Sequence, residues 1–310
     1  MPKQDGRYGY HLWIALISLV GGGFILLAYV LWSAYQDVWT EARSVASGQA
    51  ELLEARFDAT LRRVEATLDD MAVRVPEDAF QAKSAERFRQ MIEAELERAR
   101  HVFPEVAGFR IIDADGVVLY RSGGGEYANL ADRPYFREPK ENIAAGLVFS
   151  EVITSRITGR PSLAAARAIR TADGRFIGVI SAAIELSYFE ALFKSVRLGE
   201  LGALAIRRSD LHTLVVRHPP APGEVNRALD ATNPIVRSLK AGERRGVFEF
   251  RAQSDGIQRV YGYRALEDYP FYVIAGLSEQ DVMATWRRRV LLVALLGGIL
   301  FVSLVAVVVG

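Results

Sequence analysis

The chain has 310 residues, of which 50% are hydrophobic and 24% are charged, and its formal net charge is +1. This balance leaves no basic excess to bind nucleic-acid phosphates, and the absence of cysteine excludes disulfides, thiolate metal ligands and cysteine nucleophiles. High hydrophobic content beside many charges indicates that very apolar segments alternate with ordinary soluble ones.

The first apolar segment, residues 11–32, contains no Lys, Arg, Asp or Glu. As a helix it would extend roughly 33 Å, enough to cross a hydrocarbon core of about 30 Å. Trp13, Tyr29 and Trp32 lie towards its ends, where amphipathic rings favour the interface. We predict a transmembrane helix after a cytoplasmic N-terminus at residues 1–10. A cleaved signal peptide is the alternative, but the segment is too long and lacks a cleavage site.

A second uncharged apolar segment, residues 290–310, predicts a second transmembrane helix. The sequence ends inside this segment, so we expect the natural protein to continue into a cytoplasmic output domain, which can be enzymatic. Lys3 and Arg7 favour a cytoplasmic N-terminus, which puts residues 33–289 in the periplasm of a bacterial inner-membrane protein. The arginines at 287–289 then oppose the positive-inside tendency.

Residues 33–105 form a predicted helical stalk. Over residues 33–75 apolar residues recur at steps of four and three, the seam of a helix packed against a partner. The seam consists of Phe57, Leu61, Val64, Leu68, Met71 and Val75. In the distal half the partner is the chain's own domain. The half near the membrane, around Val38, Ala42 and Val45, has no obvious cover and favours a parallel homodimer. Pro76 ends this helix, and a second one follows.

From residue 106 the apolar pattern changes to the period of strands. In residues 106–198, two strand patterns flank an Ala-Asp-Gly turn at 114–116, and a loop, three further strand patterns and a helix follow. Residues 199–289 repeat the order of strand, acidic turn, strand, loop and strand pair. The repetition predicts an α+β fold with a membrane-distal unit (106–198) and a membrane-proximal unit (199–289).

Motifs for catalysis and for metal or cofactor binding are missing from the sequence. The four histidines have no metal-ligand spacing, and there is no P-loop, dinucleotide fingerprint or GxSxG elbow. The glycine run at 123–125 lacks the following helix that phosphate binding needs. We therefore expect no catalytic residue, metal, cofactor or enzyme activity within these residues.

The order of the motifs resembles a known family. After a long helix come a DADG hairpin, ADRPYFRE, FSEVITSRITGRPSLAAARAI and DGRFIGVISAAIELSYFEALF, an order similar to that of double Cache (PDC-type) extracytoplasmic sensor domains. The resemblance covers roughly residues 33–289 and is closer to the domains found ahead of bacterial diguanylate cyclases and related signalling proteins. It implies two stacked PAS-like antiparallel-sheet subdomains between the transmembrane helices, with a small extracellular ligand in the distal unit.

Arg133 in the RPYF segment is the main candidate for ligand binding. Its planar guanidinium suits a carboxylate, and the rings of Tyr135 and Phe136 can wall a small cleft. The alternative is that Arg133 pairs with Asp132 or Glu138 and that both rings belong to the core. The full set of candidate ligand-binding residues is Arg133, Tyr135, Phe136, Tyr120, Ser150, Thr154, Arg167 and Ser181.

The resemblance also bears on the ligand class. Amino-acid-binding members of the family have an aromatic residue five positions before this arginine and an aspartate on the last strand of the distal sheet. Here those positions are Ala128, with Tyr127 one residue away, and Ala183. An α-ammonium group then has no obvious partner, so we expect a carboxylate or another small anion.

These observations predict the sensory input module of a bacterial transmembrane signalling receptor. A small ligand would bind the distal unit, and the proximal unit would pass the signal to a cytoplasmic effector, for which the resemblance favours a diguanylate cyclase. The alternatives are the input domain of a histidine kinase or chemoreceptor, or a ligand-independent dimerisation module. The expected partners are a small-molecule ligand, the membrane and a second copy of the chain, without nucleic acid.

Overall fold

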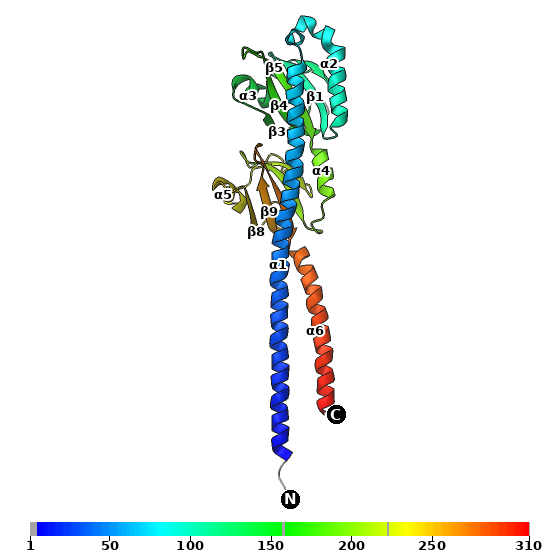
Figure 1. The fold of residues 1–310 in the computed structure, drawn as a ribbon, viewed down its shortest axis with the longest axis vertical. Coiled ribbons are helices and arrows are strands. Elements are labelled where there is room, and N and C mark those ends of the chain that lie inside the picture. Colours follow the sequence, from blue (N-terminus) through cyan, green and yellow to red (C-terminus); the bar gives the residue numbers. More distant parts are fainter. Residues whose placement is uncertain (1–4, 157–158, 222, 310) are drawn as a thin grey trace.

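The computed structural model describes residues 5–156, 159–221 and 223–309. Residues 1–4 of the expected cytoplasmic N-terminus lie outside this description. One helix, α1 (Asp5–Arg74), runs along most of the long axis, and two β-sheet units sit one above the other against its upper half (Figure 1). A second long helix, α6 (Glu279–Val309), descends from the lower unit beside α1. The chain therefore enters and leaves the two units at the same end of the molecule.

The upper, distal unit is an antiparallel sheet in the strand order β2-β1-β5-β4-β3. Its elements are η1 (Glu77–Phe80), α2 (Ala82–Val102), β1 (Val106–Asp113), β2 (Val118–Arg121), α3 (Pro134–Glu141), β3 (Val148–Thr154), β4 (Pro161–Arg170), β5 (Phe176–Glu185) and α4 (Leu186–Lys194). Helices α1 and α2 cover one face of this sheet, and α3 lies on the other (Figure 1).

The lower, proximal unit repeats this topology in the strand order β7-β6-β10-β9-β8. Its elements are β6 (Ala203–Arg208), β7 (Leu214–His218), α5 (Pro234–Lys240), β8 (Arg245–Arg251), β9 (Gln258–Ala265) and β10 (Phe271–Ser278). Strand by strand, the order matches that of the distal sheet. The prediction of an α+β fold with a long N-terminal helix and two antiparallel-sheet units is confirmed.

The hairpin between β1 and β2 shows how local sequence sets the fold. The carboxylate of Asp113 accepts hydrogen bonds from the backbone N–H groups of Asp115 (3.0 Å) and Val117 (2.8 Å), which closes the turn. Gly116 has a φ of 86°, and a Cβ there would lie 2.5 Å from the Cβ of Ala131. The turn therefore needs glycine for its backbone conformation and for the close passage of the following loop.

The apolar seam of α1 packs on the protein's own sheets. Its fully buried members are Phe57, Leu61, Val64 and Leu68. Nearer the expected membrane, Ala42 and Ala46 are buried against Val260 of β9. The expectation that α1 lacks cover here is therefore wrong at Ala42, whereas Val38 and Val45 are only partly buried. Helix and strand come this close because Gly262 on β9 has no side chain, and a Cβ there would overlap the carbonyl oxygen of Ala46.

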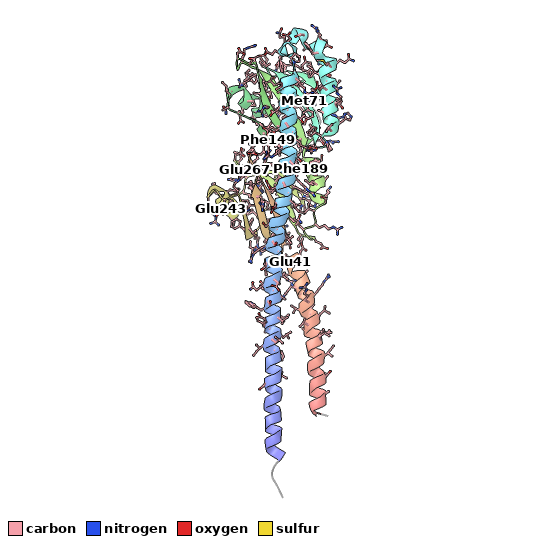
Figure 2. The ribbon with its side chains drawn as sticks, in the orientation of Figure 1. Glu41, Met71, Phe149, Phe189, Glu243 and Glu267 are labelled. Atoms are coloured by element: carbon pink, nitrogen blue, oxygen red, sulfur yellow. The ribbon has the colours of Figure 1, made fainter. Side chains whose placement is uncertain are left out.

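Aromatic rings from four elements meet at the junction between the two units. The ring of Phe271 on β10 lies 4.9 Å from that of Phe149 on β3 and 5.3 Å from that of Phe57 on α1. Phe57 in turn lies 5.1 Å from Phe189 on α4. Phe149 and Phe189 appear at the level of the junction in Figure 2. One continuous core therefore joins both sheets to α1.

Within the described residues, no helix combines the length and the apolar character needed to cross a membrane. The predicted spans at 11–32 and 290–310 belong to the lower parts of α1 and α6, and several of their side chains lie outside the described residues. The two helices touch below the proximal unit. The rings of Tyr35 and Trp286 are 5.7 Å apart, and the indole N–H of Trp286 donates to the carbonyl oxygen of Leu31 at 3.4 Å.

Candidate functional site

The RPYF segment forms the start of α3 and lies on the face of the distal sheet that this helix covers. Pro134 occupies the first turn of α3, where its fixed φ suits a helix start, and it leaves Arg133 in an extended conformation just before the helix. The first turn then lays Tyr135 and Phe136 on the sheet. Both rings are buried in a small apolar cluster that includes Ile112, Leu130, Ala164, Ala166 and Val179.

Arg133 does not form either of the ion pairs considered from the sequence. Asp132 pairs instead with Arg156, at 2.8 Å and 3.2 Å between the guanidinium and the carboxylate, and these hydrogen bonds lower the pKa of Asp132. Within the described residues the half-buried Arg133 side chain makes no hydrogen bond or ion pair, and its Nε atom is buried. Its Nε atom is therefore a buried donor without an acceptor among the described residues.

Two further arginines lie on the same face. Arg110 on β1 is 5% exposed and donates to the backbone carbonyl oxygens of Phe109 (2.6 Å), Ser122 and Gly124 (3.0 Å). Its cross-strand neighbour on β2 is Arg121. The Nε atoms of both arginines are buried without a partner among the described residues.

Positive charge dominates around the Tyr135 hydroxyl. Burial raises the pKa of Tyr135, while the guanidinium groups of Arg133, Arg156 and Arg110 act to lower it. Burial and the neighbouring Arg121 together lower the pKa of Arg110 to about 10, which Glu93 and Glu97 of α2 partly oppose. The Tyr135 hydroxyl makes no hydrogen bond within the part of the chain that the structure describes. A phenol and several incompletely bonded guanidinium groups suit a small anion.

Ser181 lies on this face, but the positions of Ser150 and Thr154 are less suited to a ligand. The register places Ser181 of β5 between Arg110 of β1 and Ala166 of β4. The Ser150 hydroxyl accepts from the N–H of Ala164 at 2.9 Å and donates to the next residue's carbonyl, so it stabilises an irregularity in β3. Thr154 is exposed at the end of β3.

Tyr120 and Arg167 lie on the opposite face of the sheet. The Tyr120 hydroxyl donates to the carbonyl oxygen of Ala79 at 2.7 Å, and Arg167 forms ion pairs with Glu65 (3.3 Å) and Asp69 (2.7 Å) of α1. Side chains alternate between the two faces of a strand, so neither residue shares a cavity with Arg133. This corrects the expectation that all the candidates line one site.

The arginines missed in the sequence carried a usable signal. Arg110 is a single charge inside the apolar run of β1, and its side chain is buried. A charged residue is rarely buried unless it has a partner, so an arginine inside such a run indicates a binding partner for it. Arg121 follows Tyr120 directly. Because side chains alternate along a strand, Arg121 lies on the α3 face and Tyr120 on the opposite one. Arg156 was not identifiable, because its pairing with Asp132 depends on how two loops meet.

A long helix that carries two sheets of the same strand order, with a basic face on the first, is the architecture of a two-unit sensor domain. The chain belongs to the Cache domain family, whose model matches residues 32–286, and the expected double Cache sensor domain is confirmed. Cache domains are ligand-binding sensor modules and not catalytic ones. No curated protein matches the chain significantly.

Solved structures share this fold. The extracellular domain of the putative histidine kinase rpHK1S-Z16 is 24% identical with a TM-score of 0.66, covering 82% of this chain and 99% of that one. The ligand-binding domain of the Pseudomonas fluorescens chemoreceptor CtaA, in complex with L-alanine, is 15% identical with a TM-score of 0.55, covering 77% and 98%. That of the Pseudomonas aeruginosa PAO1 amino acid chemoreceptor PctB, in complex with L-Arg, is 14% identical with a TM-score of 0.61, covering 79% and 91%.

Proposed function

We propose that this chain is the input module of a bacterial transmembrane receptor and that its distal unit binds a small anion, first of all a carboxylate. The observation that carries the proposal is the set of three arginines, Arg110, Arg121 and Arg133, whose Nε atoms are buried without a partner among the described residues. A carboxylate would supply the missing negative charge and acceptors.

The ligand differs from the amino acids bound by CtaA and PctB. An amino acid needs acceptors for its ammonium group as well as donors for its carboxylate. On this face Ala183 stands where the resemblance places the aspartate, and Asp132 is already paired with Arg156. The proposed ligand is therefore an anion without an ammonium group.

We further propose that residues 11–32 and 290–310 anchor the module in the inner membrane, with residues 33–289 in the periplasm. Both segments lack charged residues. Below the proximal unit, α1 and α6 expose large apolar side chains such as Phe24, Ile25, Leu291 and Leu292. Such contiguous exposure suits lipid contact better than water. Within a homodimer, displacement of α6 by the ligand would carry the signal.

The output partner is a cytoplasmic effector. The similar structures include extracellular domains of histidine kinases and ligand-binding domains of chemoreceptors, which favours these two outputs. The diguanylate cyclase expected from the sequence has no support from these comparisons.

Calorimetry on the purified 310-residue chain in detergent micelles tests the distal site. Carboxylates, amino acids, amines and nucleobases are titrated into the wild type, Arg133→Ala and Arg175→Ala, an exposed arginine of the same unit that serves as the matched control. We expect carboxylate binding that is lost in Arg133→Ala and kept in Arg175→Ala.

At a hundredfold excess over Kd, the ligand should raise the free energy of unfolding by about 2.7 kcal/mol. If the amino acids bound and the other carboxylates did not, the proposed ligand class would be refuted. No binding at all, with Arg133→Ala merely less stable, would favour the ligand-independent module.

A further inference from the structure

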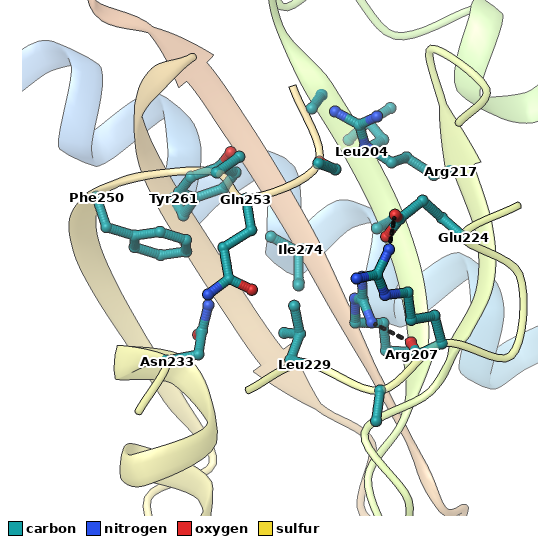
Figure 3. Close-up of a pocket in the computed structure, with 16 residues that line it drawn as sticks. Leu204, Arg207, Arg217, Glu224, Leu229, Asn233, Phe250, Gln253, Tyr261 and Ile274 are labelled. Carbon is teal, nitrogen blue, oxygen red and sulfur yellow. Dashed lines mark hydrogen bonds and ion pairs between the residues drawn. The ribbon is translucent and has the colours of Figure 1, made fainter. Parts of the chain in front are cut away.

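A second candidate site lies in the proximal unit. A cavity of about 100 Å³ opens between the sheet, the loop before α5 and the turn between β8 and β9. Figure 3 shows Arg207, Asn233, Gln253 and Tyr261 around it, with Leu229 and Ile274 between them. The cavity occupies the sheet face opposite α1, as the basic face does in the distal unit.

Arg207 on β6 is the charged group that the fold leaves incompletely bonded. Its side chain is 7% exposed, and its Nη1 atom donates to the carbonyl oxygens of His212 (3.0 Å) and Arg227 (3.1 Å). Its Nε and Nη2 atoms make no hydrogen bond to any described residue, and no carboxylate among those residues pairs with it. Burial lowers the pKa of Arg207, as expected for a cation without a counter-ion.

The carboxylates around the cavity already have partners. Asp255 is shared by Arg217 and Arg259, and Glu224 pairs with Arg227 at 2.9 Å. With Arg207 this makes four guanidinium groups against two carboxylates. Two positive charges are therefore in surplus: one is Arg207, and the other belongs to the two arginines that share Asp255, so the cavity favours an anion over a cation or a zwitterion.

The remaining lining limits what the anion can be. Ile274, Leu229 and Phe250 offer an apolar surface, which a bare inorganic anion would leave unfilled. The side-chain oxygen of Asn233 accepts from the N–H of Ile235 at 3.0 Å, so its NH₂ group remains a donor. The Gln253 side chain makes no hydrogen bond to a described residue. These amides can serve a hydroxyl or keto oxygen beside the carboxylate.

We propose that the proximal cavity is a second ligand site that takes a monocarboxylate of about two to four carbons. A molecule of this size fits a cavity of about 100 Å³, which is roughly the volume of three water molecules. The carboxylate binds the Nε and Nη2 edge of Arg207, and the short apolar part contacts Ile274 and Phe250. This site is independent of the distal one. The module therefore has a second input, in the unit from which α6 begins.

The test is calorimetry on the purified 310-residue chain carrying Arg133→Ala, which removes the proposed distal site. Acetate, propionate, lactate and pyruvate are titrated, with inorganic phosphate, sulfate and propylamine as comparison probes. Two variants address the cavity: Arg207→Lys keeps the charge but loses the planar fork, and Ala205→Leu fills the space with an apolar side chain. Arg237→Ala, an exposed arginine on α5, is the matched control.

At least one of the carboxylates should bind in the Arg133→Ala background and in the control. Its affinity should fall about tenfold or more in Arg207→Lys and in Ala205→Leu, with circular dichroism showing that both remain folded. Absence of carboxylate binding in the Arg133→Ala background would overturn the proposal. So would binding that neither cavity variant weakens, or tighter binding of phosphate or sulfate than of any carboxylate. Because the distal site is already removed by Arg133→Ala, this result does not depend on whether the distal site binds a ligand. The proposal for the distal site and the proposal for the proximal cavity can therefore be refuted separately.

Discussion

The Nη1 atom of Arg208 in the proximal unit lies 2.7 Å from the carbonyl oxygen of Phe149 in the distal unit. The same atom donates to the carbonyl oxygen of Ser150 at 2.9 Å, and the guanidinium is also paired with Asp210. Phe149 and Ser150 lie where the register of β3 against β4 shifts. Such an irregularity leaves carbonyl groups without a ladder partner, and Arg208 satisfies them.

Asn226 extends this contact along the edge of the distal sheet. Its side-chain amide donates to the carbonyl oxygen of Val152 at 2.7 Å, and its side-chain oxygen accepts from the N–H of the same residue at 3.0 Å. Strand β3 is the last strand of its sheet, so these side chains cover part of an otherwise open edge. The two units are thus held together by polar contacts as well as by the aromatic junction.

Replacement of Arg208 by alanine should therefore destabilise the whole module. Arg208→Ala leaves two buried carbonyl groups unbonded and Asp210 unpaired. The free energy of unfolding should fall by about 1.5–3 kcal/mol, the usual contribution of hydrogen bonds to a charged group. Urea unfolding followed by circular dichroism measures the loss. Arg245→Ala, an exposed arginine on β8, should change it by less than about 0.5 kcal/mol. Equal midpoints for the two variants would show that the Arg208 contact contributes nothing to stability.

The sequence was most informative where a pattern repeats within one element. The spacing of the α1 seam and the two hairpin turns with acidic residues predicted the helix, the strands and their repeated order. The sequence was least informative about which face of a strand a side chain occupies. Tyr120 and Arg167 were expected in the same cavity as Arg133, but both lie on the opposite face of the sheet, and register shifts at Val106 and Ile111 displace β1 against its neighbours.

Burial of charge was the second limit. Arg207 and Arg208 end a strand and read as solvated residues, yet both are less than 9% exposed. Their positions depend on the junction between the units and on the loop before α5, neither of which has a pattern in the sequence. In the sequence Arg133 is close to the carboxylates of Asp132 and Glu138, but in the structure Asp132 forms its ion pair with Arg156. Local sequence therefore predicted the candidate arginine but not its neighbours.

The contact of α1 with β9 depends on a missing side chain. A Cβ at Gly262 would overlap the backbone of Ala46, whereas a Cβ at Gly48 on α1 would meet nothing within 4 Å. Gly262→Ala must push the helix from the sheet, so we expect a loss of about 1–3 kcal/mol in the free energy of unfolding. Gly48→Ala should instead add up to about 1 kcal/mol, because alanine favours the helix.

Thermal unfolding of the two variants beside the wild type measures both effects. Because each change adds a single methyl group, each variant serves as the control for the other. If Gly262→Ala were as stable as Gly48→Ala, the close packing of α1 on β9 would not exist in solution.

Asp255 should give the proximal unit an acid-sensitive component of stability. Burial alone would raise its pKa, but hydrogen bonds from Arg259, the N–H of Ile257 and Arg217 outweigh it and lower the pKa from 3.8 to about 2. A depressed pKa means that the ionised form stabilises the fold. This stability is complete above the unfolded pKa, near pH 4, and is lost as the pH falls towards 2. The shift corresponds to about 2 kcal/mol.

Urea unfolding at a series of pH values from 2 to 7 tests this relation. Asp255→Asn should be less stable than the wild type at pH 7 by about 2 kcal/mol, and the difference should shrink as the pH falls towards 2. Asp115→Asn changes an exposed carboxylate in the β1–β2 turn of the distal unit, and should leave the pH profile close to that of the wild type. If the Asp255→Asn difference stayed constant down to pH 2, the ion pairs with Arg217 and Arg259 would not be the source of the stabilisation. The expected convergence would show instead that charge on Asp255 holds the turn beside the proximal cavity.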